Sequence, residues 1–336
     1  MGIMQMLMSG GGGLDVSEVF DTYLYEGDGV GGTTPRAITT GMDLDAPNVG
    51  MIWVKCRDGS IDHALFDTIR GATEMLRSDG NGSELLDINS LTAFTSDGFT
   101  TNGSAYTNLI SGSGGGGYVA WSFKAAPKFF DVVTWTGDAV DTTTLRTISH
   151  NLGCKPGMII VKDRDDSESW AVYHTAIGSD KYLVLDTSAG KQDDSSGLWW
   201  GDTEPTSSVF TIQSANMVNK YDDNYVAYLF AEDEDNIKCG SFNGTAGTTV
   251  NVGFEPQWVI LKRTDGGDYW YILDKERGLP TADSTDSTGL FADSPASETS
   301  WSNEPRIYTT ATGFTVSTGT GLNPNPYLYI AIKKED

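Results

Sequence analysis

Three stretches of the sequence align with one another without a gap. Each begins with four apolar residues and a lysine, continues through an aspartate three positions later and a second apolar run, and ends in a glycine. The stretches are 51–71, 158–178 and 258–278, at offsets of 107 and 100 residues. Repetition at a fixed period indicates a modular architecture, so the sequence predicts three copies of one module of roughly one hundred residues.

The similarity between the copies covers nearly the whole chain after residue 18. Each copy closes on a run that starts with tyrosine and is rich in aromatic residues; these runs are 118–124, 225–231 and 327–333. Boundaries placed after these runs divide the chain into four segments. They are an N-terminal arm (1–18) and three β modules (19–126, 127–233 and 234–336).

The first copy departs from the other two in the residues that lead into it. A pattern of Asn-x-Gly-x-x-Pro precedes the second and third copies, at 151–156 and 251–256. Before the first copy only Thr40, Gly41 and Pro47 correspond to this pattern. The departure leaves open whether the first module packs as the other two do.

The repeated segments have the composition of β-strands. Runs of five to seven residues rich in Val, Ile, Tyr, Trp and Phe alternate with clusters of Gly, Asp, Asn, Ser and Thr, which favour turns. Only 60–77 keeps a helix-compatible composition, and its counterparts at 170–173 and 270–273 favour strands. By repetition, we predict that 63–66 is also a strand.

A module of about one hundred residues with six or seven short strands has the size of a β-sandwich or jelly roll. The predicted fold class is therefore all-β, with three tandem, jelly-roll-like β-sandwich modules and a short N-terminal arm. The alternative is a propeller-like ring with two four-stranded blades per repeat, because one blade takes about 40–50 residues.

The charge and hydropathy of the chain exclude two classes of partner. Of the 336 residues, 46 are acidic and 22 are basic, which gives a formal net charge of −24. Binding to a nucleic-acid backbone requires clusters of Lys and Arg, so we expect no nucleic-acid partner. No apolar run approaches the roughly eighteen residues of a transmembrane helix, so we expect no membrane insertion.

The cysteines and the N-terminus indicate where the protein is made. Cys56, Cys154 and Cys239 lie far apart and form no Cys-x-x-Cys pair, which is untypical of a disulfide scaffold. The apolar N-terminal segment is short and has no positive flank, so it does not resemble a signal peptide. We therefore expect synthesis and assembly in a reducing cytoplasm.

The N-terminal segment suggests a role in assembly. Residues 1–8 contain four methionines and two aliphatic residues, and Ser9 and the glycine run 10–13 follow them. Methionine side chains are unbranched and fill irregular grooves well. Our hypothesis is an assembly arm that docks into a neighbouring subunit. The alternative is that the segment folds back on its own first module.

Side chains that could carry catalysis are sparse. The histidines are His63, His150 and His174, and no Gly-x-Ser-x-Gly elbow accompanies them. His63 and His174 lie in the repeated strand region, where the third copy has Trp270 and Asp274 at the corresponding positions. Because the residue type changes between copies, we interpret both histidines as polar strand residues near a turn.

Carboxylates are numerous, and a paired-carboxylate glycosidase is the enzyme class most worth considering. The repeated aspartates are Asp58, Asp165 and Asp265, and each precedes a glycine or an aspartate where a turn is expected. We interpret them as turn-forming residues, because a single enzyme would not repeat one catalytic carboxylate three times. We assign no catalytic residue and expect that the protein is not an enzyme.

Metal and cofactor motifs are also weak. The densest acidic runs, 163–166 and 232–235, do not follow the spacing of a calcium-binding loop, although a structural calcium ion is left open. The glycine runs 10–13 and 114–117 have no lysine or helix pattern behind them, so a phosphate loop is not expected. We therefore assign no metal-binding and no cofactor-binding residue.

The nine tryptophans and fourteen tyrosines could offer platforms for sugar rings. Trp199, Trp200 and Trp301 lie beside Gly, Asp and Pro, outside the strongest strand patterns, where partial exposure is expected. We favour core packing for these residues, because a ring near a turn often folds back onto a sandwich. Sugar stacking is the alternative.

Several co-linear segments between residues 19 and 336 resemble a family of repeat-built virion proteins carried by tailed, often marine, bacteriophages. They include FDTYLYEGDG, DHALFDTIRGATEML, YVAWSFKAAPKFFDVVTWTGD, TISHNLGCKPGMIIVKDRD and GFEPQWVILKR. The resemblance implies a structural protein of the particle, in the tail or its fibres. It implies no catalytic residues.

The sequence thus favours a phage virion structural protein, a tail or tail-fibre component that mediates assembly and host attachment. We expect a homo-oligomer, most simply a trimer, because closed cyclic symmetry is the default for such assemblies. It would bind other virion proteins through its N-terminal arm and a glycan or protein on the host surface. The alternatives are a capsid decoration protein or head fibre, and a carbohydrate-binding, lectin-like module.

Overall fold

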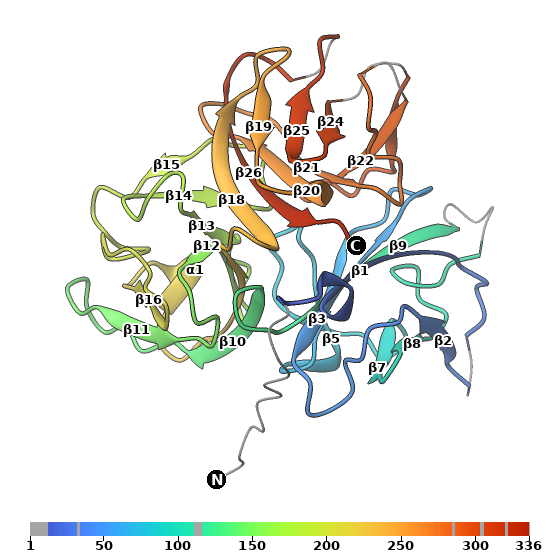
Figure 1. Ribbon diagram of the computed structural model, residues 1–336. Helices are drawn as coiled ribbons and strands as arrows, with labels where there is room; N and C mark the ends of the chain where they lie inside the picture. Colours follow the sequence, from blue (N-terminus) through green and yellow to red (C-terminus); the bar gives the residue numbers. More distant parts are fainter. Residues whose placement is uncertain are drawn as a thin grey trace.

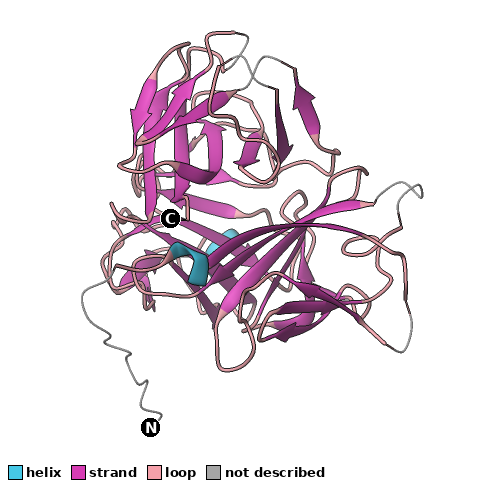
Figure 2. Ribbon diagram, turned by 45° about the vertical axis from the view of Figure 1, so that its right-hand side comes forward, coloured by secondary structure: helices cyan, strands magenta, loops and turns pink. Residues whose placement is uncertain are grey.

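The structure is a computed structural model that describes residues 13–31, 34–110, 116–283, 286–302, 306–319 and 322–335. Within these ranges nearly all regular structure is strand, and the helical parts are the 3-10 helix η1 (Val16–Glu18) and the single turn α1 (Asn216–Asn219) (Figure 2). The all-β prediction is confirmed. The first twelve residues of the predicted arm lie outside the described residues.

Three six-stranded antiparallel sheets form the body, and their strands follow equivalent orders (Figure 1). The order in the first sheet is β1 (Phe20–Glu26), β9 (Gly117–Lys124), β3 (Gly50–Cys56), β4 (Ala64–Asp67), β5 (Gly71–Leu76) and β6 (Leu85–Leu86). In the second it is β10 (Phe130–Thr136), β17 (Asn224–Ala231), β12 (Pro156–Asp163), β13 (Ala171–His174), β14 (Lys181–Val184) and β15 (Gln192–Asp193). In the third it is β18 (Ile237–Asn243), β26 (Pro326–Lys333), β20 (Pro256–Arg263), β21 (Trp270–Asp274), β22 (Ser287–Phe291) and β23 (Thr299–Trp301).

A smaller antiparallel sheet packs against the outer face of each six-stranded sheet, which gives a sandwich. The first small sheet has the order β2 (Arg36–Thr39), β8 (Gly98–Thr101) and β7 (Leu91–Thr95). The second pairs β11 (Arg146–Ser149) with β16 (Val209–Ile212). The third has the order β19 (Thr249–Asn251), β25 (Gly313–Val316) and β24 (Ile307–Thr310).

The strand β3 explains why the repeat starts with an unbroken apolar run. Neighbouring side chains of a strand point to opposite faces. Met51 and Trp53 face a core in the middle of the molecule, whereas Ile52 and Val54 face the core of their own sandwich. The strand next to it, β4, confirms the strand predicted at 63–66.

The central core joins all three sheets. Phe20 and Phe123 from the first sheet, Phe130 and Phe230 from the second and Trp258 from the third form one aromatic cluster. Their ring centroids lie 5.0–5.9 Å apart in tilted and edge-to-face pairs. Such aromatic pairs contribute about 0.5–1.5 kcal/mol each beyond the area that they bury. The three sheets therefore share a core instead of folding around separate ones.

The sheets are arranged around this core as a ring. In Figure 1 the first sheet (blue to cyan) lies at the lower right, the second (green to yellow) at the left and the third (orange to red) at the top. The described end of the N-terminal arm belongs to the same body, because Val16 is buried in the central core and Leu14 packs against it.

Candidate functional site: three junctions between the sheets

Three backbone hydrogen bonds mark equivalent junctions between neighbouring sheets. In each, the residue just before the last strand of one sheet donates its N–H to the carbonyl two positions after the repeated lysine of the next. The bonds are Glu84 to Arg164 (2.8 Å), Lys191 to Thr264 (2.9 Å) and Glu298 to Arg57 (2.7 Å). The third bond returns from the third sheet to the first. The ring is therefore closed within one chain.

Each junction also contains a buried ring N–H that donates to a carbonyl across the boundary. Trp170 Nε1 donates to Arg77 O at 2.9 Å, and Trp270 Nε1 donates to Val184 O at 3.0 Å. The residue in the corresponding place in the first module is His63, whose Nε2 lies 2.9 Å from Phe291 O.

The tautomer of His63 follows from its second contact. Its Nδ1 accepts a hydrogen bond from Trp53 Nε1 at 2.8 Å, so Nε2 must carry the proton that Phe291 O accepts. Complete burial lowers the pKa of His63 well below its usual value, so the ring is neutral. His63 therefore acts as a structural donor at a junction between sheets.

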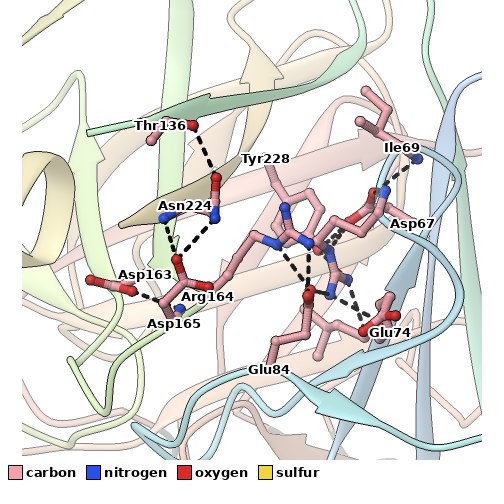
Figure 3. Close-up of polar contacts among 12 residues, drawn as sticks. Asp67, Ile69, Glu74, Glu84, Thr136, Asp163, Arg164, Asp165, Asn224 and Tyr228 are labelled. Carbon is pink, nitrogen blue, oxygen red and sulfur yellow. Dashed lines mark hydrogen bonds and ion pairs between the residues drawn. The ribbon is translucent and has the colours of Figure 1, made fainter. Parts of the chain in front are cut away.

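The junction between the first and second sheets holds a charge network in which Arg70 and Asp67 are fully buried (Figure 3). Arg70 Nε lies 2.5 Å from Asp67 Oδ2, and Arg70 Nη1 lies 2.7 Å from Glu84 Oε2. From the second sheet, Arg164 Nη2 reaches Glu84 Oε1 at 2.7 Å and the Tyr228 hydroxyl donates to Asp67 Oδ2 at 2.9 Å. Both carboxylates are thus shared between the two sheets.

The junction between the third and first sheets repeats this network with different residues. Arg277 Nε lies 2.6 Å from Asp274 Oδ2, and Arg277 Nη1 lies 3.2 Å from Glu298 Oε1. From the first sheet, Arg57 Nη2 reaches Glu298 Oε2 at 2.8 Å and Trp121 Nε1 donates to Asp274 Oδ2 at 2.9 Å. The residue types differ only where Trp121 replaces Tyr228.

The junction between the second and third sheets has no counterpart of the aspartate–arginine pair that the other two junctions contain. His174 and Ile177 occupy the places that Asp67 and Arg70 have in the first module. The Nδ1 atom of His174 accepts from Ala176 N at 3.1 Å, so its Nε2–H donates to Tyr329 O at 3.1 Å. Burial lowers the pKa of His174 to about 4. The three junctions thus share a geometry, but two contain an aspartate–arginine pair and the other contains a neutral histidine in the place of the aspartate.

The repeated lysines are buried, and sequence reasoning assigned them no role. Burial lowers the pKa of Lys55, Lys162 and Lys262 to about 8. Their ammonium groups donate to backbone carbonyls: Lys55 to Cys56 (2.6 Å), Lys162 to Asp163 (2.5 Å), and Lys262 to Asp268 (2.5 Å) and Ser188 (2.7 Å). The sequence did contain a signal for a structural role, because a lysine recurs at the same position in three buried strands.

The repeated aspartates lie in bends, as predicted. Asp58 Oδ2 accepts from Gly117 N and Asp165 Oδ2 accepts from Asn224 N, each at 2.7 Å, so both hold the start of the neighbouring long strand. Asp265 instead pairs with Arg263 Nε at 2.7 Å.

The other candidate residues are dispersed. Trp200 is buried, whereas Trp199 and Trp301 are half-buried, and Trp199 stacks on Tyr182 at 4.1 Å. His150 is buried near the second small sheet, with its Nδ1 accepting from Leu152 N at 3.3 Å. Cys56, Cys154 and Cys239 are free thiols.

The acidic and glycine-rich runs do not assemble a binding site in the part of the chain that the structure describes. No group of three His, Cys, Asp or Glu side chains there could hold a metal ion, and this includes the described runs 163–166 and 232–235. Residues 10–12 and 114–115 of the glycine runs lie outside the described residues. The described helices include none that is long and apolar enough to cross a membrane.

Comparison with known proteins gives one match. Neither a curated protein nor a solved structure matches the sequence. A family described as a domain of unknown function (DUF7483) matches residues 15–335, which span the three sheets and their junctions. The chain therefore belongs to the DUF7483 family.

Proposed function

We propose that the protein is a structural component of a bacteriophage virion, in the tail or a tail fibre, that mediates assembly and host attachment. The observation that carries the proposal is the closure of three sheets into one ring through hydrogen bonds and ion pairs at their junctions. Side chains at the junctions hold the three sheets together as one body. A single body of this kind suits a structural component of a particle. The resemblance of several co-linear segments to phage virion proteins adds support.

The charge distribution fits a component that assembles through its N-terminus. The whole chain carries a formal charge of −24, which keeps bodies apart in solution, whereas residues 1–14 carry no charged side chain. We propose that this segment joins the body to other virion proteins and to further copies of the chain, in a trimer. The loops at the far side of the sandwiches would contact a glycan or protein of the host.

Immunoelectron microscopy of purified particles tests the proposal. An antibody against residues 127–336 should label the tail or its fibres. Particles grown with a variant that lacks residues 1–13 should lose the label, while the variant chain accumulates as a folded, soluble protein.

The other outcomes contradict the location in the tail, the virion role or the role of the arm. Label over the head would make the protein a capsid decoration protein or head fibre. A complete absence of label on intact particles would contradict a virion role and favour a carbohydrate-binding module. Full incorporation of the shortened chain would contradict the role of the arm but not the virion location.

A further inference from the structure

The segment that joins the last two strands of each six-stranded sheet contains an Asn-Gly pair only in the first module. The three segments are 79–84, 186–191 and 293–298. Each begins with an aspartate whose Oδ1 accepts from a backbone N–H, and each ends with the residue that donates the junction hydrogen bond. At the third and fourth positions the first module has Asn81 and Gly82, where the others have Ser-Ala and Pro-Ala.

An Asn-Gly pair is chemically reactive, because the backbone nitrogen of the glycine can attack the side-chain carbonyl carbon of the asparagine. Glycine has no Cβ to hinder the approach, and it adopts backbone conformations that other residues avoid. The serine and proline of the other two modules have no side-chain amide to lose. The whole chain contains three Asn-Gly pairs, at 81–82, 102–103 and 243–244.

The fold holds two of the three pairs. Gly244 N donates to Asn325 O at 2.8 Å, so the attacking atom is already engaged in a hydrogen bond. Asn102 N donates to two backbone carbonyl groups, at 3.1 and 3.2 Å, which fixes the chain before its glycine. In contrast, no group in the described part of the chain accepts from Gly82 N, and Asn81 is exposed. Asn81 and Gly82 are therefore the pair that the fold protects least.

This pair lies at the junction between the first and second sheets. Asn81 Nδ2 donates to Ser167 O, in the second module, at 3.2 Å. The same segment makes two further contacts with that module: Gly80 O accepts from Trp170 Nε1 at 3.2 Å, and Glu84 donates the backbone hydrogen bond described above. A change at Asn81 therefore acts directly on the contact between two sheets.

We infer that Asn81 deamidates spontaneously in the folded protein, and that the change weakens the junction between the first and second sheets. Gly82 N forms a bond to Asn81 Cγ, the Cγ–Nδ2 bond breaks, and Nδ2 leaves as ammonia with the proton from Gly82 N. Water then opens the resulting succinimide at either of its carbonyl carbons, which gives aspartate or isoaspartate. Neither step oxidises or reduces a group, and water is the only molecule consumed.

Deamidation changes what residue 81 offers to the second module. A carboxylate only accepts hydrogen bonds, so it cannot donate to Ser167 O as the amide does. It also places a negative charge beside that carbonyl oxygen. Isoaspartate in addition inserts a methylene group into the main chain between Gly80 and Glu84, and so alters the spacing of their contacts with the second module.

Incubation of the purified full-length chain in mildly alkaline buffer, followed by digestion and mass spectrometry, tests the reaction. The tryptic peptides 78–124 and 239–262 contain Asn81 and Asn243 in unfolded form and provide reference rates. In the folded chain Asn81 should convert at a rate within a few-fold of that in its peptide. Asn243 should convert many-fold more slowly than in its peptide, because its reaction requires the end of a strand to open. Equal protection of the two residues by the fold would overturn the inference.

Substitution Gly82→Ala copies the residue of the second module and should slow the conversion of Asn81 several-fold, because the added methyl group hinders the attack. The atom nearest to the new Cβ is Arg77 Nη2, at 2.9 Å, which is the end of a flexible side chain that can move aside. An unchanged rate in this variant would contradict attack by Gly82 N.

Substitution Asn81→Asp reproduces one product and tests the effect on the junction. It should lower the Tm by about 1–2 °C, the shift expected for the loss of one hydrogen bond in a chain of this length. The matched control is Asn89→Asp, which adds the same charge at another exposed residue of the first module and should leave the Tm unchanged. An unchanged Tm for Asn81→Asp, or an equal loss in both variants, would overturn the weakening of the junction. Purified protein is sufficient for every measurement, so these outcomes are independent of where the protein is located.

Discussion

Two aspartates at the same strand position have carboxyl groups in different surroundings. Asp131 in β10 accepts hydrogen bonds from Asn151 N (2.7 Å) and Val132 N (3.0 Å). Asn151 begins the Asn-x-Gly-x-x-Pro lead-in, which the first module lacks. Asp21 in β1 accordingly has a buried Oδ2 with no partner among the described residues. Burial, together with the charges of Glu335 and Glu276, raises the pKa of Asp21 to about 7.

Substitution Asp21→Asn should stabilise the protein, and more at pH 8 than at pH 4.5. The pKa of Asp21 is higher in the folded state than in the unfolded state, so this residue binds more protons in the folded state between about pH 4 and 7. Its contribution to stability therefore falls as the pH rises through this window. Allowing for solvent screening of a partly exposed group, we expect a gain on the order of 1–2 kcal/mol at pH 8.

Thermal unfolding at the two pH values measures this difference. The control is Asp131→Asn, which weakens the acceptor of two backbone N–H groups and should destabilise by about 1 kcal/mol at both pH values. A change in Tm for Asp21→Asn that is the same at pH 4.5 and pH 8 would contradict the account of its carboxyl group.

At the scale of elements, the sequence repeat was sufficient to predict the strands. It did not predict which residues of neighbouring sheets meet at the junctions. Comparison of copies identified β4 as a strand, although its surroundings have a helix-compatible composition. Nothing in the spacing of the repeat indicated that Glu84 would meet Arg164, or that Glu298 would meet Arg57 across 241 residues. Side chains of equivalent elements pair across module boundaries, and a repeat pattern describes only one module at a time.

Substitution Arg70→Met should destabilise the protein by about 3–5 kcal/mol, because it leaves the buried Asp67 without a cation and Glu84 with Arg164 alone. Denaturant unfolding measures the loss. The loss should be large although the side chain removed lies in a turn between two short strands.

The control for this substitution is Arg77→Met in the same module. Its guanidinium pairs with Asp62 at 2.8 Å, but the two side chains are 29% and 34% exposed. Ion pairs of this kind contribute about 0–1 kcal/mol. The backbone carbonyl of Arg77 would still accept from Trp170. Comparable losses for the two variants would mean that the network is no more than a surface ion pair.

At the scale of the molecule, the shared core links the stability of the three sheets. The aromatic cluster contains rings from every sheet, and one of the junctions connects the third sheet to the first. A sheet that unfolds therefore exposes apolar faces of both neighbours and leaves their junction groups unpaired. The stability of each sequence module therefore depends on the other two.

We therefore expect one cooperative unfolding transition for the whole chain. Calorimetry should give a ratio of calorimetric to van't Hoff enthalpy close to one. Residues 127–233 expressed alone should fail to fold, because Phe130, Phe230 and Trp170 would lose the surfaces that cover them. Arg70→Met provides a sharper test than the isolated module. A substitution at one junction should lower the Tm of the single transition without splitting it into two. Three resolved transitions, or a folded isolated module, would show that each sandwich is stable without the ring.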